Sequence, residues 1–130
     1  MHKVILMLLL AVVSSSAMAE WVVISGIDDL GITVYADPSS IRKSGNKVKM
    51  WILFDFSSVH EASGTKSLSS MVQDEFDCKE EQLKTLHFTW YSKNMGRGDV
   101  VYTGKKYAKN WTPVYPDSSS KTLWKYACEK

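Results

Sequence analysis

The chain has 130 residues, with 16 Lys and Arg against 14 Asp and Glu and a formal net charge of +2. A chain of this length can build one domain but not two. The near balance of charge argues against bulk nucleic-acid binding, which requires a marked basic surplus.

Residues 1–19 are expected to be a secretory signal peptide that is not part of the fold. A short basic start precedes the apolar run of residues 4–13, and Ala17-Met18-Ala19 is an A-x-A cleavage signature. The apolar run is too short to anchor a chain across a membrane. A buried N-terminal helix is the alternative. We therefore expect a single mature domain at residues 20–130, and no lipid anchor at its start because no Cys follows the cleavage signature.

Alternating apolar and polar residues predict β-strands in the first half of the mature chain. Strands are expected at residues 21–25 and 32–36, and the strongest pattern is KVKMWILFDF at residues 47–56. Turn-forming residues at 37–40 and 44–46 separate these strands, and the segment between the two turns is expected to be a short helical turn.

The middle of the chain is expected to hold a loop and then a hairpin. The polar residues 57–67 predict a loop that contains His60, and a strand resumes near Ser67 and runs to Cys78. The strand after it, at residues 82–92, and a returning strand at 99–103 form the hairpin. Strict alternation in the first of these strands places Leu86, Phe88 and Trp90 on one face, and Thr85, His87, Thr89 and Tyr91 on the other.

The C-terminal segment has the pattern of an amphipathic helix. Pro116-Asp117-Ser118 is typical of a helix start, with Asp117 or Ser118 as the cap. The apolar stripe that follows consists of Leu123, Trp124, Ala127 and Cys128. The pattern therefore predicts an α+β domain in which Cys128 points inward with the apolar residues.

The two cysteines, Cys78 and Cys128, are expected to form a disulfide. An even number of cysteines in an exported chain favours this interpretation. The bond would close a loop of roughly 50 residues and stabilise the fold by about 4 kcal/mol in the chain-entropy model. A metal site or a nucleophile is the alternative, but no His lies near either cysteine in the sequence.

No residue pattern in the chain indicates catalysis. The sequence lacks a G-x-S-x-G motif, a phosphate-binding loop and the His pair, four residues apart on a helix, that a metal site would use. We interpret His87 as a surface residue of a strand. We therefore predict that the protein is not an enzyme and uses no cofactor or metal.

Two segments are candidates for binding a protein partner. In residues 105–115, Lys105, Lys106 and Lys109 alternate with aromatic residues, a composition that suits anionic partners. The alternative is a solubilising loop whose Trp111 packs in the core. The second candidate is Arg97-Gly98-Asp99, the tripeptide that animal integrins recognise. The neighbouring glycines suit a tight hairpin turn, which is the interpretation that we favour, and we expect Arg97 and Asp99 at an exposed hairpin tip.

The order of four segments resembles the bacterial surface-adhesin protein E family. The segments are VYADPSSIRKSGNKVKMWILFDF at 34–56, EFDCK at 75–79, NMGRGDVV at 94–101 and WTPVYPDSSSKTLWKYAC at 111–128. The resemblance implies a curved antiparallel β-sheet of about six strands with a C-terminal helix held against it by a disulfide. It also implies adhesion to host matrix or plasma proteins such as vitronectin, laminin and plasminogen.

We therefore expect an exported, non-enzymatic binding protein, periplasmic or associated with the cell surface. Two other hypotheses are a small-ligand binder that uses the concave sheet face and a periplasmic enzyme inhibitor. An apolar cavity under the helix would favour the small-ligand binder, and a sheet fully packed by the helix would favour the adhesin. A homodimer is a further association that the sequence leaves open.

Overall fold

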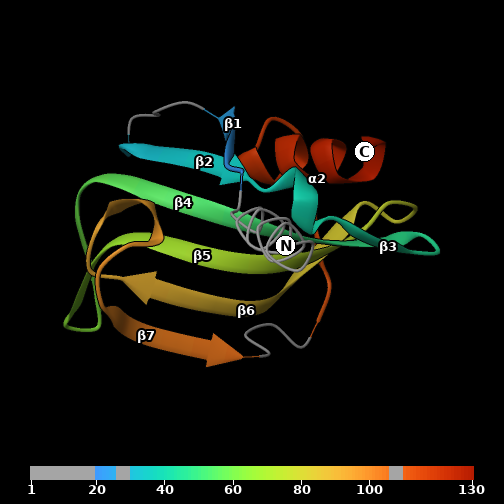
Figure 1. Ribbon diagram of the computed structural model, residues 1–130. Helices are drawn as coiled ribbons and strands as arrows, with labels where there is room; N and C mark the ends of the chain where they lie inside the picture. The colour runs from blue at the N-terminus through green and yellow to red at the C-terminus, as the bar shows by residue number, and fades with distance from the viewer. Residues whose placement is uncertain (1–19, 26–29, 106–109) are drawn as a thin grey trace, which may run out of the picture.

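The computed structural model describes residues 20–25, 30–105 and 110–130. Within these ranges it contains one antiparallel β-sheet and one C-terminal α-helix, α2 (Figure 1). The strands are β1 (Val22–Ser25), β2 (Ile32–Ala36), β3 (Arg42–Ser44), β4 (Lys47–Ala62), β5 (Thr65–Asp77), β6 (Gln82–Tyr91), β7 (Val100–Lys105) and β8 (Thr112–Pro113). The helix α2 is Ser119–Glu129, and two 3-10 turns are η1 (Pro38–Ser40) and η2 (Asn94–Gly96).

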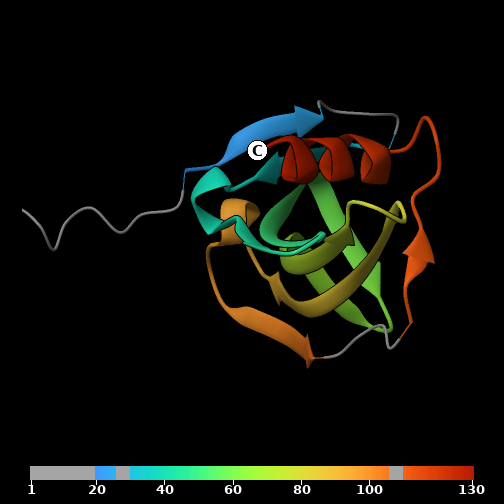
Figure 2. The same ribbon diagram turned by 90° about the vertical axis from the view of Figure 1, so that its right-hand side faces the viewer.

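The sheet confirms the expected α+β class. Its main path is β1-β2-β4-β5-β6-β7, six strands, while the short β3 pairs with β4 and the short β8 pairs with β6. Figures 1 and 2 place α2 beside the β1 and β2 end of the sheet and β7 at the opposite end. The helical turn expected between the turns at 37–40 and 44–46 is wrong, because that segment forms the strand β3. The helical turn lies earlier, in η1, where the Asp37 carboxylate accepts a hydrogen bond from the Ser39 backbone N–H.

The loop predicted at residues 57–67 is wrong, because β4 continues to Ala62 and β5 already begins at Thr65. Ser63 and Gly64 alone make the turn, and both have positive φ angles, 52° and 79°. Such a two-residue turn matches the twist of the strands that it joins. The polar residues of this hairpin reflect exposure to water and not a lack of pairing, and His60 is therefore a strand residue opposite Ser67.

The core lies between α2 and one face of the sheet. Leu123 and Ala127 of the helix are buried against a cluster of side chains from three strands. That cluster consists of Val34, Ala36, Val48, Met50, Ile52 and Phe76. Ser118 caps the helix, since its Oγ accepts a hydrogen bond from the Lys121 backbone N–H at 3.2 Å. The predicted apolar stripe of the helix is thus the face that packs on the sheet.

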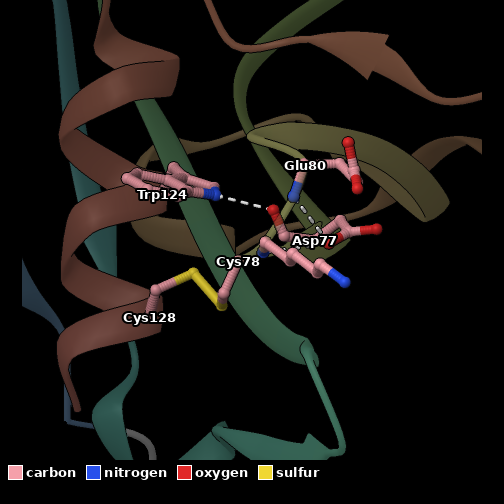
Figure 3. The surroundings of a disulfide bond; sticks show 6 residues. Asp77, Cys78, Glu80, Trp124 and Cys128 are labelled. Atoms are coloured by element: carbon pink, nitrogen blue, oxygen red, sulfur yellow. Dashed lines mark hydrogen bonds between the residues drawn. A yellow bond between two sulfur atoms is a disulfide. The ribbon is translucent and has the colours of Figure 1, made fainter.

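The disulfide between Cys78 and Cys128 fixes α2 to the end of β5, as the sequence predicted (Figure 3). The two Cα atoms are 5.7 Å apart across a sequence separation of 50 residues. A second link lies beside it, because the Trp124 indole N–H donates to the Asp77 carbonyl at 2.9 Å. The helix is therefore held by one covalent bond and one hydrogen bond at the same end of β5.

Candidate functional site

The face of the sheet that packs against α2 continues beyond the helix as an open surface. Residues directly opposite each other in an antiparallel pair lie on the same face. Val72 is opposite both the core residue Ile52 and Phe88, so Phe88 shares the core face. We call this face, which carries the buried cluster described above, the inner face. It extends from the helix to β7.

Aromatic side chains cover the open part of the inner face. Phe88, Trp90 and Tyr102 contact one another, with ring centroids separated by 6.0 Å (Phe88–Trp90), 5.6 Å (Phe88–Tyr102) and 4.8 Å (Trp90–Tyr102). On β4, the ring of Phe56 stacks on that of His60 at 4.6 Å. β6 and β7 thus carry one aromatic cluster and β4 carries a second one.

Three adjoining hollows lie among these rings, with volumes of about 250, 300 and 260 Å³. All three are lined by Trp90, and the third also includes Ala62 and Thr65 from the tip of the β4–β5 hairpin. The hairpin therefore curls over the inner face and bounds it. We call the combined hollow the aromatic groove; its principal lining residues are Phe54, Phe56, His60, Val72, Asp74, Thr85, Phe88, Trp90 and Tyr102.

Asp74 is the one carboxylate among the residues that line the first hollow. The residue is 6% exposed, and its Oδ1 accepts a hydrogen bond from the Thr85 hydroxyl at 2.7 Å. Burial raises the pKa of Asp74 to about 6, although the Thr85 hydrogen bond acts in the opposite direction. Burial disfavours the charged form of a carboxyl, so the pocket favours the protonated form of this residue.

A β-bulge brings Thr85 to Asp74 and corrects the strict alternation expected in β6. His87 is opposite Gln73, but Thr85 is opposite Asp74, so Leu86 is an extra residue on β6. A bulge of this kind lets two consecutive residues oppose one and shifts the facing of the residues beyond it. Thr85 therefore lines the groove together with Phe88, whereas alternation predicted that the two residues face opposite ways.

The tripeptide Arg97-Gly98-Asp99 lies in the exposed connection between β6 and β7, as the sequence predicted. Gly98 has a φ of +81°, and the Asp99 N–H donates to the Ser92 hydroxyl at 2.8 Å. Because a positive φ favours glycine, the turn itself accounts for Gly98. Arg97 and Asp99 are both exposed on this connection.

The same connection is anchored to the outer face of the sheet. Asp55 Oδ1 accepts hydrogen bonds from the Asn94 side-chain amide at 3.1 Å and the Met95 N–H at 2.7 Å. The buried Ser69 hydroxyl donates to the Lys93 carbonyl at 2.6 Å and accepts from the Gly96 N–H at 2.8 Å. The hairpin tip is therefore a fixed structure, and its tripeptide is held in one exposed position.

The predicted basic segment is only partly within the described residues. The Lys105 backbone ends β7, while Lys106 and Lys109 lie outside the described ranges. Trp111 is half-buried on the outer side of the sheet, with the Lys84 ammonium 4.7 Å and the Lys47 ammonium 5.7 Å from its ring centroid. This pairing could not be predicted from the sequence, because both lysines come from strands remote from Trp111 in the chain.

Asp74 was not among the predicted site residues, although the sequence carries a signal for it. Ser70, Val72, Asp74 and Phe76 alternate along β5, so an acid stands where the pattern requires an inward residue. Among the described residues, no group of three or more His, Cys, Asp or Glu is placed to hold a metal ion. In the same part of the chain, no helix has the length and apolar character needed to cross a membrane.

Comparison with known proteins gives a family and a fold. A family model described as surface-adhesin protein E matches residues 21–129. No curated protein sequence matches the chain.

Solved structures that resemble this one include those of Haemophilus influenzae protein E. Its crystal form II has a TM-score of 0.57 and 13% sequence identity, covering 74% of this chain and 80% of that chain. Protein E from non-typeable Haemophilus influenzae has a TM-score of 0.53 and 12% identity, covering 88% of this chain and 79% of that chain. At such low identity the likeness establishes the fold alone, because one fold can serve many functions.

Proposed function

The chain belongs to the surface-adhesin protein E family, and we propose that it is an exported, non-enzymatic binding protein whose ligand is another protein. The observation that carries this proposal is the family match, which extends over residues 21–129. Membership of the family supports a surface adhesin, exported from the cell or exposed on its surface. Export by the signal peptide at residues 1–19, with cleavage before Glu20, is part of the proposal.

The proposed partner is a host matrix or plasma protein, and two surfaces are proposed to contact it. The first is the anchored tip with Arg97 and Asp99, which are both exposed. The second is the basic segment with Lys105, Lys106 and Lys109. An exposed tripeptide on a fixed turn loses little conformational freedom on binding, which favours recognition.

Location in the cell is the first test of the proposal. Cells that make the native protein are fractionated, and intact cells are treated with a protease that cannot enter the periplasm. Cleavage of the protein on intact cells is the expected result. A protein found only in the periplasm and protected from the protease would contradict a role in adhesion.

Binding to immobilised vitronectin, laminin and plasminogen tests the partner class. Alanine is placed at Lys105, Lys106 and Lys109 together, and a matched control variant carries alanine at three lysines exposed elsewhere, Lys43, Lys49 and Lys125. The first variant should bind more weakly and with a flatter salt dependence, because exposed charge contacts are screened by salt. Equal binding of both variants at low and high salt would exclude the basic segment.

A second candidate function is the binding of a small ligand. The observation that favours it is the aromatic groove, which α2 leaves uncovered and which has one polar side at Asp74 and Thr85. Small-molecule sites typically combine apolar walls with a few placed polar groups. Titration with an aromatic amine, described below, separates this function from the binding of a polypeptide.

A further inference from the structure

We propose that the aromatic groove binds an extended segment of the partner protein and holds one lysine side chain of that segment against Asp74. The inference rests on the proposed function, because it names the chemistry by which the protein partner is recognised. The proposed ligand of the groove is a polypeptide, so the inner face of the sheet would be a binding surface in addition to the hairpin tip and the basic segment.

Asp74 supplies the charge that would select a cation. It is a buried carboxylate, and among the described residues the ion pairs are Lys84–Glu75 and Lys121–Glu81, neither of which includes it. A carboxylate can accept about four hydrogen bonds, so the Thr85 hydroxyl leaves acceptor capacity for an ammonium group. A cation in the hollow would provide the counter-charge that the buried carboxylate lacks within the described chain.

The walls of the hollow suit the same cation. Phe54, Phe88 and Trp90 line it together with Asp74. The faces of aromatic rings attract ammonium groups, most strongly when water is excluded. The four methylene groups of a lysine side chain would pack on the rings while its ammonium reaches the carboxylate. Apolar contact and charge therefore favour one and the same side chain.

The geometry favours lysine over arginine. Arginine binds a carboxylate best through two parallel hydrogen bonds to both oxygens. Thr85 already occupies Oδ1 of Asp74, and the β-bulge at Leu86 holds Thr85 in place. A compact ammonium can approach one side of the carboxylate without displacing this hydroxyl, whereas a planar guanidinium would compete with it.

The length of the groove favours a polypeptide over a small amine. The hollow beside Asp74 shares Phe54, Ser70 and Trp90 with the next hollow, which reaches Phe56 and His60. At the β7 edge, the large apolar side chain of Tyr102, which lines the third hollow, is 48% exposed. A small amine would fill only the Asp74 end, while a chain segment would also cover the apolar surface on either side.

The test is a calorimetric titration of the exported protein with three capped pentapeptides. The first is acetyl-Ala-Phe-Lys-Phe-Ala-amide; the second replaces lysine with norleucine, and the third with Nε-acetyl-lysine. Saturable binding of the lysine peptide is expected, with at least tenfold weaker binding of the other two. Equal binding of the norleucine peptide, or no binding of the lysine peptide, would overturn the proposal.

Two variants and a control locate the bound lysine. Asp74→Asn removes the charge and should weaken the lysine peptide at least tenfold, and Trp90→Leu should weaken it at least threefold. The control is Glu75→Gln, which removes a charge from the adjacent residue of β5 on the outer face and should change binding less than twofold. Circular dichroism confirms that each variant is folded. Unchanged binding by folded Asp74→Asn would overturn the proposal.

Two further measurements are needed. The first distinguishes a small amine from a lysine side chain as the ligand, and the second distinguishes failure of the lysine site from failure of the proposed adhesion. If phenethylammonium binds as tightly as the lysine peptide, the proposal that the groove binds a polypeptide would be overturned, and a small amine would be the ligand. Wild-type protein and Asp74→Asn are also compared on immobilised vitronectin, laminin and plasminogen. Equal binding by both would overturn the lysine site while the proposed adhesion stands. Failure of the wild type to bind any of the three proteins would count against the proposed adhesion. The peptide titration would still test the lysine site independently.

Discussion

Replacing Asp74 with Asn should make the protein more stable at neutral pH. The carboxyl has a folded-state pKa of about 6, against an ordinary value of 3.8. The folded state therefore binds the proton more tightly than the unfolded state does. The difference corresponds to a cost of up to about 3 kcal/mol in the free energy of unfolding once the group is ionised.

The sign of the pH dependence follows from the raised pKa. Below pH ~4 the carboxyl is protonated in both states, and it costs the folded protein nothing. Between pH ~4 and about 6 the unfolded state releases its proton while the buried carboxyl retains it, so stability falls, and it levels off at higher pH, where both states are ionised. Asn carries no charge and can still accept the Thr85 hydrogen bond through its carbonyl. The stability gain of Asp74→Asn should therefore be small at pH ~4 and largest above pH ~7.

Among the described residues, no other charged residue lines the hollow, so the pH dependence of stability should reflect Asp74 itself. The other residues of its hollow are Phe54, Ser70, Val72, Thr85, Phe88 and Trp90, and none of them carries a charge. His60 lines the adjoining hollow. The stacking of its imidazole on Phe56 is common to the wild type and the variant, so it should not contribute to the difference between them.

Urea unfolding at several pH values between 4 and 8 measures the effect. The wild type, Asp74→Asn and the control Glu75→Gln are compared at constant ionic strength. Glu75 forms a partly exposed ion pair with Lys84 at 3.6 Å, so its loss should cost less than about 1 kcal/mol. The reasoning would be refuted if Asp74→Asn were no more stable than the wild type at pH 7, or if its gain did not grow with pH.

Three further predictions concern the disulfide and the turn. The double variant Cys78→Ser/Cys128→Ser should lose about 4 kcal/mol of stability and melt at a lower temperature, and melting at the wild-type temperature would contradict this. Gly98→Ala should destabilise more than Gly45→Ala, since both residues have positive φ but only at Gly98 would the added Cβ clash with a side chain; equal losses in urea unfolding would exclude the clash. Asp99→Glu should leave the melting temperature unchanged. It should release adherent cells from the immobilised protein only if the tripeptide is an integrin ligand.

The strands, the helix and the disulfide could be predicted from local signals. KVKMWILFDF has an apolar residue at every second position from Val48 to Phe56 because that face of β4 packs inward, and its first residue is the first residue of the strand. The helix was predictable because Leu123 and Ala127 recur at helical spacing. The pairing of Cys78 with Cys128 needed only an even count and export. None of these predictions required knowledge of which strands become neighbours.

The groove could not be predicted, because it depends on pairing between strands. The bulge at Leu86 becomes visible only when β6 is aligned with β5, and it alone brings Thr85 to Asp74. The hairpin tip at Ser63 and Gly64 was hidden for a different reason. Its polar composition resembles that of a loop, and hydrogen bonding to a neighbouring strand leaves no mark on composition.

The position of Asp74 argues that the groove is a binding surface and not an unfinished core. Phe76, two residues along β5, is fully buried in the cluster beneath α2, and an apolar residue at position 74 would extend that cluster without a charge penalty. A cost of up to about 3 kcal/mol is large for a domain whose total stability is typically about 5–15 kcal/mol. Destabilising groups of this kind are characteristic of functional sites, where activity and stability compete.

A bound ammonium would favour the ionised carboxyl and lower its pKa, so ligand binding would recover part of the stability that the empty groove lacks. The lysine peptide should accordingly raise the melting temperature of the wild type at pH 7 and leave that of Asp74→Asn unchanged.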